Sequence, residues 1–387
     1  MCGFFGFYNS NLNIEEKVNI SKKAIKILHS RGPDHNDIWA DSEKNLIFSF
    51  NRLSILDQST KGNQPMHSHT ERFTIIFNGE IYNHNELRRE IYINHNFNKW
   101  NGSSDTETLL ACIEFFGVEE CLKKLNGMFA LVLWDNKDKT MYLARDRFGE
   151  KPLYYGWIKN NKSFVFSSEL IFDKLFDDIN FKINQSALKE LLYLNYVNNE
   201  HSMLQGILKV APASYLKVKF TNNNEPIINS NIYWDLTKES SGEKNFYKDE
   251  KSALKELDNL LTNAVKKQLV ADVEVGTFLS GGIDSSLITA KAQELSSKKI
   301  TSFTIGSDNK NYDESDYAEQ VAKYLKVDHQ KLIINEKEIL DQIPSILSGM
   351  NEPLGDSSFI PTFLVSKMAA SKIKVALTGD AGDELFG

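Results

Sequence analysis

The first residues that could do chemistry stand at the start of the chain, Met1-Cys2-Gly3. A small residue after Met1 favours removal of the initiator methionine, which would leave Cys2 with a free α-amino group. An α-amine has a pKa of about 7.7–8, so it can take the proton of the thiol on its own residue. Cys2 is therefore a candidate N-terminal nucleophile. Because many chains begin this way by chance, this hypothesis depends on the rest of the sequence.

A glycine-rich segment in the second half is a candidate phosphate site. Ser280-Gly281-Gly282-Ile283-Asp284-Ser285-Ser286 follows an apolar run and precedes a helical pattern. Its glycines let the backbone approach an anion, its serines add hydroxyl donors, and a helix N-terminus directs free N–H groups at the ligand. It is not a Walker loop, because no Gly-Lys-Ser/Thr follows. A plain glycine turn is the alternative, which the added Asp-Ser-Ser disfavours.

An acidic, glycine-rich segment occurs close to the last residue of the sequence: Leu377-Thr378-Gly379-Asp380-Ala381-Gly382-Asp383-Glu384-Leu385-Phe386-Gly387. It also follows a strand pattern. Glycines and carboxylates at the carboxyl end of a strand suit a ligand crevice at a topological switch point, and an acidic surface loop is the alternative. Since both loops follow strands of one predicted sheet, we expect them to converge.

The elements that must position these residues fall into two halves. In the first half, strands separated by turns predict antiparallel sheets with helices packed outside. The predicted strands are 2–8, 46–55, 73–78, 128–135 and 140–145, the last two as a hairpin, and the predicted helices are 15–28, 85–92 and 104–116.

In the second half, strands and helices alternate, which predicts a doubly wound parallel sheet. The predicted strands are 273–279, 299–305, 331–334 and 374–377. One predicted helix begins at residue 284, and three others span 316–325, 337–347 and 361–371. We therefore predict domains at 2–220 and 251–387, joined by a polar linker at 221–250. Because no helix pattern follows the last strand and loop, we expect the chain to continue beyond Gly387.

Composition excludes several classes of function. A net charge of −7 without a basic run argues against nucleic-acid binding. The apolar runs are strand-sized and no secretory signal is visible, so we expect no membrane span and a cytoplasmic protein. Three cysteines, Cys2, Cys112 and Cys121, suit a reducing compartment. We expect the latter two to be structural.

A series of motifs in the first half carries a resemblance to a known family. They are Met1-Cys2-Gly3-Phe4-Phe5-Gly6, Arg31-Gly32-Pro33-Asp34, Arg52-Leu53-Ser54-Ile55, Asn78-Gly79-Glu80-Ile81-Tyr82-Asn83, Gly102-Ser103-Ser104-Asp105-Thr106-Glu107, Gly127-Met128-Phe129-Ala130 and Arg145-Asp146-Arg147-Phe148-Gly149. They resemble a class II, N-terminal-nucleophile glutamine amidotransferase domain. With the two loops of the second half, nearly the whole chain resembles the glutamine-hydrolysing asparagine synthetase family.

The resemblance implies an αββα Ntn-hydrolase sandwich followed by an α/β ATP-pyrophosphatase domain. In the first, Cys2 attacks the amide carbon of glutamine, while Asn78 and Gly79 donate to the tetrahedral oxyanion. Preorganised donors of this kind are worth about 3–4 kcal/mol each. Arg52 would bind the α-carboxylate bidentately, and Asp105 with Glu80 would hold the α-ammonium. The resemblance also places Leu53, Ser54, Ile55 and Leu56 in the glutamine site.

These residues have structural alternatives. Arg52 could form a structural ion pair, and Asn78-Gly79 could be a hairpin turn. Asp105 could cap the helix that begins nearby, although Ser103 and Ser104 are equally suitable caps.

For the second domain, the resemblance implies ATP cleaved to AMP and pyrophosphate. Asp284 and Asp383 would be ligands of Mg²⁺ on the leaving pyrophosphate. Leu279 and Ile305 would contact the adenine through backbone groups. Asp380 could act as a base on incoming ammonia. The remaining ATP-binding residues are Ser280, Gly281, Gly282, Ser285, Thr378 and Gly379.

We therefore predict that glutamine, aspartate and ATP yield asparagine, glutamate, AMP and pyrophosphate, with ammonia passing between the domains through a dry tunnel. The sequence leaves open whether the protein forms a homodimer. One rival is amidation of another carboxylate, such as a sugar acid or antibiotic precursor. A second is a β-lactam-synthetase-like enzyme, against which the intact Cys2, Arg52, Asn78 and Asp105 set argues. A third is a glutamine sensor that binds without hydrolysis.

Overall fold

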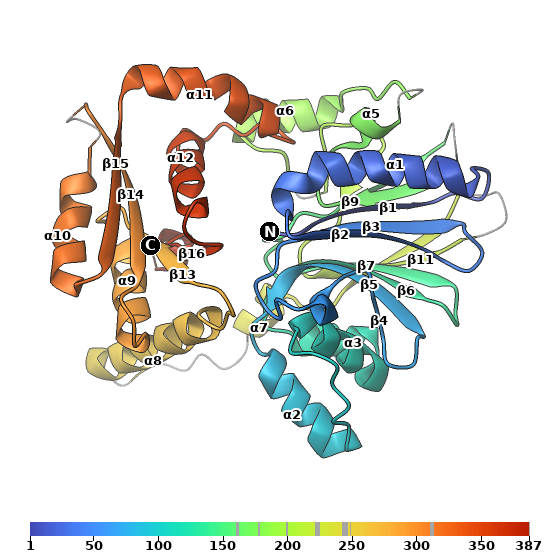
Figure 1. Ribbon diagram of the computed structural model, residues 1–387, viewed down its shortest axis with the longest axis horizontal. Coiled ribbons are helices and arrows are strands. Elements are labelled where there is room, and N and C mark those ends of the chain that lie inside the picture. The colour runs from blue at the N-terminus through green and yellow to red at the C-terminus, as the bar shows by residue number, and fades with distance from the viewer. Residues whose placement is uncertain are drawn as a thin grey trace. The chain divides into compact units, whose positions relative to one another are not determined.

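The computed structural model describes residues 1–387 except 160–161, 177–178, 199, 221–224, 242–246, 248, 310–312 and 387. Parts of the predicted linker and Gly387 of the acidic segment therefore lie outside the described residues. The chain divides into two compact units (Figure 1): unit 1 is Met1–Gly242 with Asn351–Gly355, and unit 2 is Glu243–Met350 with Asp356–Gly387. Among the described residues, no helix combines the length and apolar character that crossing a bilayer requires.

Unit 1 is built on two antiparallel sheets, in agreement with the prediction. The first has the strand order β10 (Ile207–Lys209), β8 (Tyr154–Ile158), β9 (Ser163–Ser167), β1 (Gly3–Tyr8), β3 (Leu46–Arg52) and β2 (His35–Ala40). The second has the order β12 (Ile227–Ile232), β11 (Ser214–Lys219), β7 (Thr140–Arg145), β6 (Gly127–Asp135), β5 (Phe73–Ile81) and β4 (Met66–His67). The predicted hairpin is present as β6 and β7.

The two sheets pack face to face, and helices cover their outer faces. A central cluster joins residues of both sheets, such as Phe48 of β3 and Leu143 of β7. Outside the first sheet pack α1 (Ile14–Ile27) and α5 (Phe172–Leu175). Outside the second sheet pack α2 (His84–His95), α3 (Asp105–Phe116) and α4 (Val118–Lys124). These four layers confirm the αββα sandwich.

Local sequence explains where the helices begin. Asn13 and Glu16 form a reciprocal capping box at α1, with the Asn13 side chain accepting from the Glu16 N–H at 3.0 Å and Glu16 accepting from the Asn13 N–H at 2.9 Å. Ser104 caps α3, because its hydroxyl accepts a hydrogen bond from the Glu107 N–H. Unit 1 also contains the 3₁₀ turns η1 (Leu28–Arg31) and η2 (Thr60–Gly62) and the helices α6 (Gln185–Leu194) and α7 (Leu236–Ser240).

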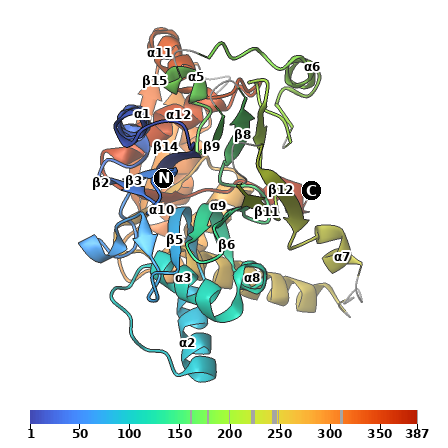
Figure 2. The same cartoon turned by 90° about the vertical axis from the view of Figure 1, so that its right-hand side faces the viewer.

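The stretch 221–250, which the sequence predicts as a linker, contains β12. This strand pairs antiparallel with β11, as Figure 2 shows, so the sheet of unit 1 continues past position 220. All six residues of β12 are exposed, and its sequence IINSNI has no alternation that a sequence pattern could detect. Backbone hydrogen bonds with β11, rather than burial of side chains, define this edge strand.

Unit 2 is a parallel sheet with helices on both faces, which confirms the doubly wound prediction. Its order is β15 (Asp328–Ile334), β14 (Thr301–Ser307), β13 (Val275–Phe278) and β16 (Val375–Leu377). One cluster joins the sheet to α8 (Glu250–Gln268), α9 (Ile283–Leu295) and α10 (Ser315–Leu325). A separate cluster around Phe303 joins it to α12 (Phe359–Ala370), which α11 (Glu336–Gly349) contacts. The short helix α13 (Gly382–Phe386) follows β16.

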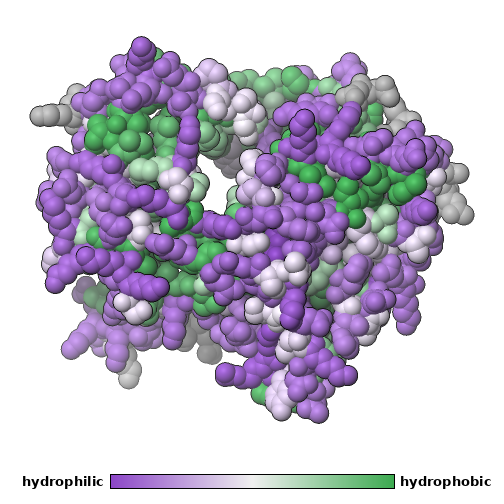
Figure 3. Space-filling model, viewed as in Figure 1, coloured by the Kyte–Doolittle hydropathy of each residue, from purple (hydrophilic) through white to green (hydrophobic). Residues whose placement is uncertain are grey.

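Unit 2 leaves an apolar surface exposed. Figure 3 shows it at the upper left, near α11 and β15. The exposed large apolar residues of these two elements are Leu332 and Ile333 of β15 and Leu340 and Leu347 of α11. Here β15 is an edge strand of the sheet. Unit 2 therefore covers its apolar side chains less completely at this edge than at the faces of the sheet.

Replacing a side chain of the central sandwich layer should destabilise unit 1. Leu143→Ala removes a fully buried side chain and should lower the free energy of unfolding by about 2–5 kcal/mol. Leu192→Ala on α6, where the side chain is 78% exposed, should change it by less than about 0.5 kcal/mol. All five tryptophans belong to unit 1, so urea unfolding followed by tryptophan fluorescence measures this unit. Equal effects of the two substitutions would contradict the assignment of the core.

Candidate active site

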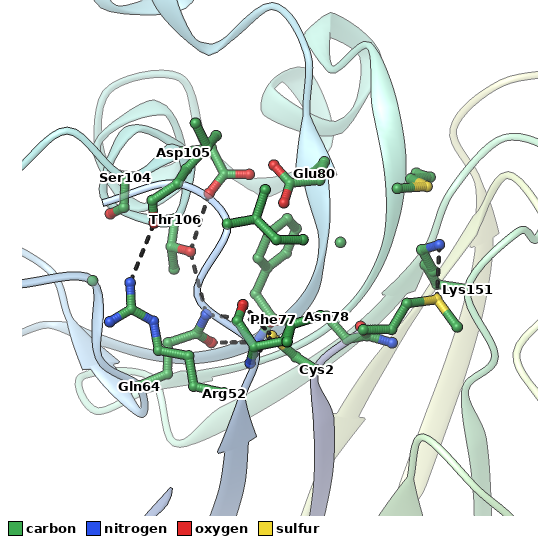
Figure 4. A pocket seen from close by; sticks show the side chains of 17 residues that line it. Cys2, Arg52, Gln64, Phe77, Asn78, Glu80, Ser104, Asp105, Thr106 and Lys151 are labelled. Carbon is green, nitrogen blue, oxygen red and sulfur yellow. Dashed lines mark hydrogen bonds between the residues drawn. The ribbon is translucent and has the colours of Figure 1, made fainter. Parts of the chain in front are cut away.

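The pairing of β1 with β3 fixes the position of Cys2. Gly3 lies opposite Asn51 in the antiparallel register, so Cys2 comes next to the residues that follow β3. The Leu53 N–H donates to the Cys2 sulfur at 3.4 Å, and the thiol lies 3.7 Å from the Leu53 carbonyl oxygen. Cys2 opens onto a small cavity of about 50 Å³ (Figure 4).

Most of the predicted glutamine-site residues line this cavity. They are Cys2, Arg52, Leu53, Ile55, Leu56, Asn78, Gly79, Glu80 and Asp105. Ser54 does not line it; its backbone N–H donates to the Asp34 carboxylate at 2.8 Å. The cavity also has walls that sequence reasoning missed: Met1, Gly62, Gln64, Phe77, Ser104, Thr106, Met128 and Lys151. Several of these belong to the quoted motifs, but no local pattern indicates which of their side chains face the cavity.

Asn78 and Gly79 lie within β5, opposite Ala130 and Phe129 of β6, so they do not form a hairpin turn. The Asn78 side-chain nitrogen is buried and has no hydrogen-bond partner among the described residues. A buried polar group without a partner costs free energy, typically about 1–3 kcal/mol. At position 79 a Cβ would lie 2.2 Å from the Met128 carbonyl oxygen, so only glycine fits without displacing β6. The site thus contains an unused N–H donor beside a position held open by glycine.

The Arg52 guanidinium is buried and already surrounded by acceptors. One terminal nitrogen donates to the Ser59 carbonyl and the Asn63 side-chain oxygen, both at 2.8 Å. The other donates to the Leu56 and Asp57 carbonyls. These partners are amide oxygens, unlike the carboxylate that a structural ion pair requires. Bidentate binding of a substrate carboxylate through the two terminal nitrogens, as the sequence predicts, would require at least two of these bonds to be exchanged.

Asp105 and Glu80 place two carboxylates in the same cavity wall. Because Ser104 caps α3, Asp105 is free to accept from the Ile81 N–H at 2.9 Å. Burial raises the pKa of Asp105, and burial together with the Asp105 charge raises the pKa of Glu80 well above its ordinary value. A cationic group entering the cavity would relieve this repulsion.

Burial shifts the pKa of the N-terminal amine and the pKa of the Cys2 thiol in opposite directions. It lowers the pKa of the Met1 amine to about 6, assisted by the positive charges of Arg31 and Lys151 and opposed by the charges of Cys2 and Glu80. Burial also raises the pKa of the Cys2 thiol. The amine is therefore mostly neutral near pH 7, whereas the thiol keeps its proton until a base removes it.

Unit 2 has a second candidate site at the carboxyl ends of β13 and β16. A cavity of about 710 Å³ is lined there by nearly all the predicted ATP-binding residues, Leu279, Ser280, Gly282, Asp284, Ser285, Ile305, Thr378, Gly379 and Asp380, and by the predicted metal ligand Asp383. Gly281 is not part of the lining. Its φ of +88° and a hypothetical Cβ 2.7 Å from the Ala318 nitrogen explain why the turn needs glycine. The lining also includes residues not predicted: Phe278, Ile283, Phe303, Thr304, Pro361, Thr362, Val365 and Gly382.

The two predicted loops converge because β13 and β16 are neighbours in the sheet. A Cβ at Gly382 would lie 2.6 Å from an Asp284 carboxylate oxygen, and one at Gly379 would lie 2.6 Å from the Ser285 nitrogen. The Thr378 hydroxyl donates to the Asp380 carboxylate at 2.8 Å. Close approach of these loops therefore requires glycine at both positions of the second loop.

The residues predicted to hold Mg²⁺ fit that ion in number and chemistry. Asp284 and Asp383 line the same cavity, and no cluster of three or more potential metal ligands exists among the described residues. Magnesium is commonly held by one or two carboxylates together with substrate phosphates and water, so two carboxylates beside the predicted phosphate loop suffice.

Comparison with known proteins matches two families to successive parts of the chain. The family described as "Glutamine amidotransferase domain" matches residues 1–234, and the family described as "Asparagine synthase" matches residues 256–387. The first match covers the two-sheet unit and includes β12.

Relatives match over the full chain. Asparagine synthetase [glutamine-hydrolyzing] 1 of Bacillus subtilis is 34% identical over 100% of this chain, which spans 58% of that relative. A Methanocaldococcus jannaschii protein, whose name gives the same activity provisionally, is 35% identical over 100% of this chain, which spans 75% of it. Among solved structures, a glutamine phosphoribosylpyrophosphate amidotransferase from B. subtilis matches 91% of this chain, and the match spans 71% of that structure's chain. The sequence identity is 14% and the TM-score is 0.42.

Glu80 should make the protein less stable as the pH rises. An unfolded glutamate has a pKa of about 4.3, and the folded value is raised, so the charged form is disfavoured in the folded state. Glu80→Gln removes this cost, so its free energy of unfolding should exceed that of the wild type at pH 8 and differ little from it at pH 4. The gain is about 1.4 kcal/mol for each pH unit that separates the folded pKa from the unfolded pKa. Urea unfolding at both pH values tests this, with the exposed Glu43→Gln as control. A gain that is equal at both pH values would contradict it.

Proposed function

Because this chain belongs to the glutamine-hydrolysing asparagine synthetase family, we propose that it carries out glutamine-dependent amidation of aspartate. Glutamine hydrolysis in unit 1 would supply ammonia to a β-aspartyl adenylate formed from aspartate and ATP in unit 2. The products are asparagine, glutamate, AMP and pyrophosphate. Since the chain spans 58% of the first relative, this activity is proposed for the complete protein. Following the sequence analysis, we place it in the cytoplasm.

The buried, unpaired Asn78 side-chain nitrogen beside Cys2 is the observation that carries the glutaminase proposal. After removal of Met1, the neutral α-amine of Cys2 takes the thiol proton, and the sulfur attacks the amide carbon of glutamine. Asn78 and the Gly79 N–H donate to the oxyanion that forms. The C–N bond then breaks, ammonia leaves with the proton from the amine, and water hydrolyses the thioester to glutamate.

Met1 itself lines the cavity, which in its presence has room for only a few water molecules. Removal of Met1 would therefore both free the amine and enlarge the space beside Cys2. The same processing step that creates the nucleophile would open its binding site.

Charge complementarity supports a preference for free glutamine over a glutamine residue in a peptide. Asp105 and Glu80 would receive the α-ammonium, whose charge relieves the repulsion between the two carboxylates. Arg52 would attract the α-carboxylate, with exchange of some of its present carbonyl partners. A peptide-bound glutamine has neither charge, so it would leave both groups without partners.

In unit 2, we propose that the Ser280–Ser285 loop and the start of α9 bind the phosphates of ATP, and that Leu279 and Ile305 contact the adenine. Asp284 and Asp383 would hold Mg²⁺, which neutralises charge on the departing pyrophosphate. Thr378 and Gly379 would approach the nucleotide from the second loop. Asp380, hydrogen-bonded to Thr378, would accept a proton from the attacking ammonia.

Cys2→Ala should abolish glutamine hydrolysis, lowering its rate at least about a thousandfold, because the nucleophile is lost. Ammonia-dependent synthesis by the complete protein should persist. Ammonia release from glutamine is the measurement, and Cys112→Ala, which alters a buried cysteine away from the cavity, is the control. Retained glutaminase turnover in the Cys2 variant would overturn the assignment of the nucleophile.

Asp284→Asn should lower AMP formation at least about a hundredfold, because stabilisation of the leaving pyrophosphate contributes several kcal/mol. Basal glutamine hydrolysis should be largely unchanged. The assay uses the complete protein with glutamine, ATP and a panel of carboxylates, and the exposed Asp341→Asn on α11 is the control. Unaltered AMP production would remove the metal role of Asp284, and amidation of a carboxylate other than aspartate would overturn the proposed acceptor.

A further inference from the structure

Lys151 is a buried cation in the wall of the Cys2 cavity that the mechanism above does not use. The residue is only 7% exposed, and its ammonium donates to the Met1 sulfur at 3.0 Å. Figure 4 shows Lys151 and Arg52 on opposite sides of Cys2. Within the described part of the chain, no carboxylate lies within 4.0 Å of the Lys151 ammonium. A thioether is a weak acceptor, so this ammonium is poorly compensated.

The backbone of Lys151 is held by the Arg145–Gly149 motif. The Lys151 N–H donates to the Asp146 carboxylate at 3.0 Å, and the Arg145 side chain donates to the Lys151 carbonyl at 2.8 Å. The Arg145 side chain also donates to the Gly149 carbonyl, where the chain turns at a φ of +71°. The motif therefore fixes the point from which the lysine side chain extends toward the N-terminus.

Removal of Met1 would take away the sulfur that the ammonium contacts. It would also create a new α-amine on Cys2, in the same cavity wall. We propose that Lys151 is a positioning residue of the proposed glutaminase, whose positive charge keeps the freed Cys2 amine neutral and thus able to accept the thiol proton. This inference rests on the proposed function and extends it to a residue that touches neither the glutamine amide nor the oxyanion donors.

Other charges also face this amine. The Arg31 side chain of η1 donates to the Cys2 carbonyl at 3.0 Å, but its charge is partly neutralised by Glu169 at 2.9 Å. Glu80 of β5 and Asp105 of α3 line the cavity and act in the opposite direction, favouring a protonated amine. Lys151 is thus, besides Arg52, a buried cation of this cavity that offsets these carboxylates. The lowered pKa of the Met1 amine, to which Lys151 contributes after burial and Arg31, agrees with this role.

The test is the pH dependence of kcat/KM for glutamine hydrolysis by the complete protein, with Met1 removal checked by intact mass. Lys151→Met keeps the length of the side chain and removes its charge. Without this charge the Cys2 amine should hold its proton to a higher pH, so the acidic limb of the kcat/KM profile should move up by about one pH unit. The variant should lose kcat/KM roughly tenfold at pH 6 and little at pH 9. Lys151→Arg should keep the wild-type limb. Lys123→Met, at an exposed position of α4, makes the same change in net charge and should leave the acidic limb at its wild-type position.

A Lys151→Met profile that parallels the wild type, at equal or uniformly lower rate, would overturn the proposal, because loss of packing alone does not move a pH limb. If Lys151→Met loses the native tryptophan fluorescence, the smaller Lys151→Gln provides the same comparison. Should wild type and Cys2→Ala release ammonia equally, the proposed glutaminase itself fails. Wild-type activity that depends on Cys2, with an unmoved limb in both uncharged variants, would reject only the role of Lys151.

Discussion

The antiparallel register between β1 and β3 is the constraint on which the Cys2 site depends. A chain terminus is ordinarily one of the least ordered parts of a domain. Here β1 lies between β3 and β9, so the residue before Gly3 has a fixed place beside Leu53. A shift of one residue would turn every side chain of β1 to the other face of the sheet. The strand pairing thus converts a terminal cysteine into a group with defined neighbours.

The same site concentrates polar groups whose burial costs stability. The Asn78 amide, the Glu80 carboxylate and the Lys151 ammonium are all enclosed with few or weak partners. Such groups are expected where a ligand or a reacting atom completes the hydrogen bonds and charges. The sandwich core can tolerate them because its central layer is formed almost wholly by fully buried apolar side chains. The groups that would bind a ligand at this site therefore lower the stability of the fold, and burial of the surrounding apolar core offsets that cost in free energy.

In unit 2, sheet order performs the corresponding task. β13 and β16 are about a hundred residues apart in sequence but adjacent in the sheet. β14 and β15 lie on one side of β13, and β16 lies on its other side, so this is the topological switch point of the sheet. Parallel strands direct their carboxyl ends to one edge, so the two glycine-rich loops meet there. The glycines at 379 and 382 allow contact close enough for Asp284 to lie against the second loop.

The sequence by itself determined the types of most elements, the two-sheet and parallel-sheet architectures, and the motifs that line both cavities, because periodicity and turn residues are local properties of the chain. It could not determine that β12 extends the sheet, since backbone pairing alone defines that exposed strand. It also could not show that Arg52 is already surrounded by carbonyls or that Ser54 is absent from the cavity wall. Tertiary structure alone decided that Met1, Gln64 and Lys151 form walls of the Cys2 cavity, because contacts between distant residues follow from strand register and packing, which no local pattern encodes.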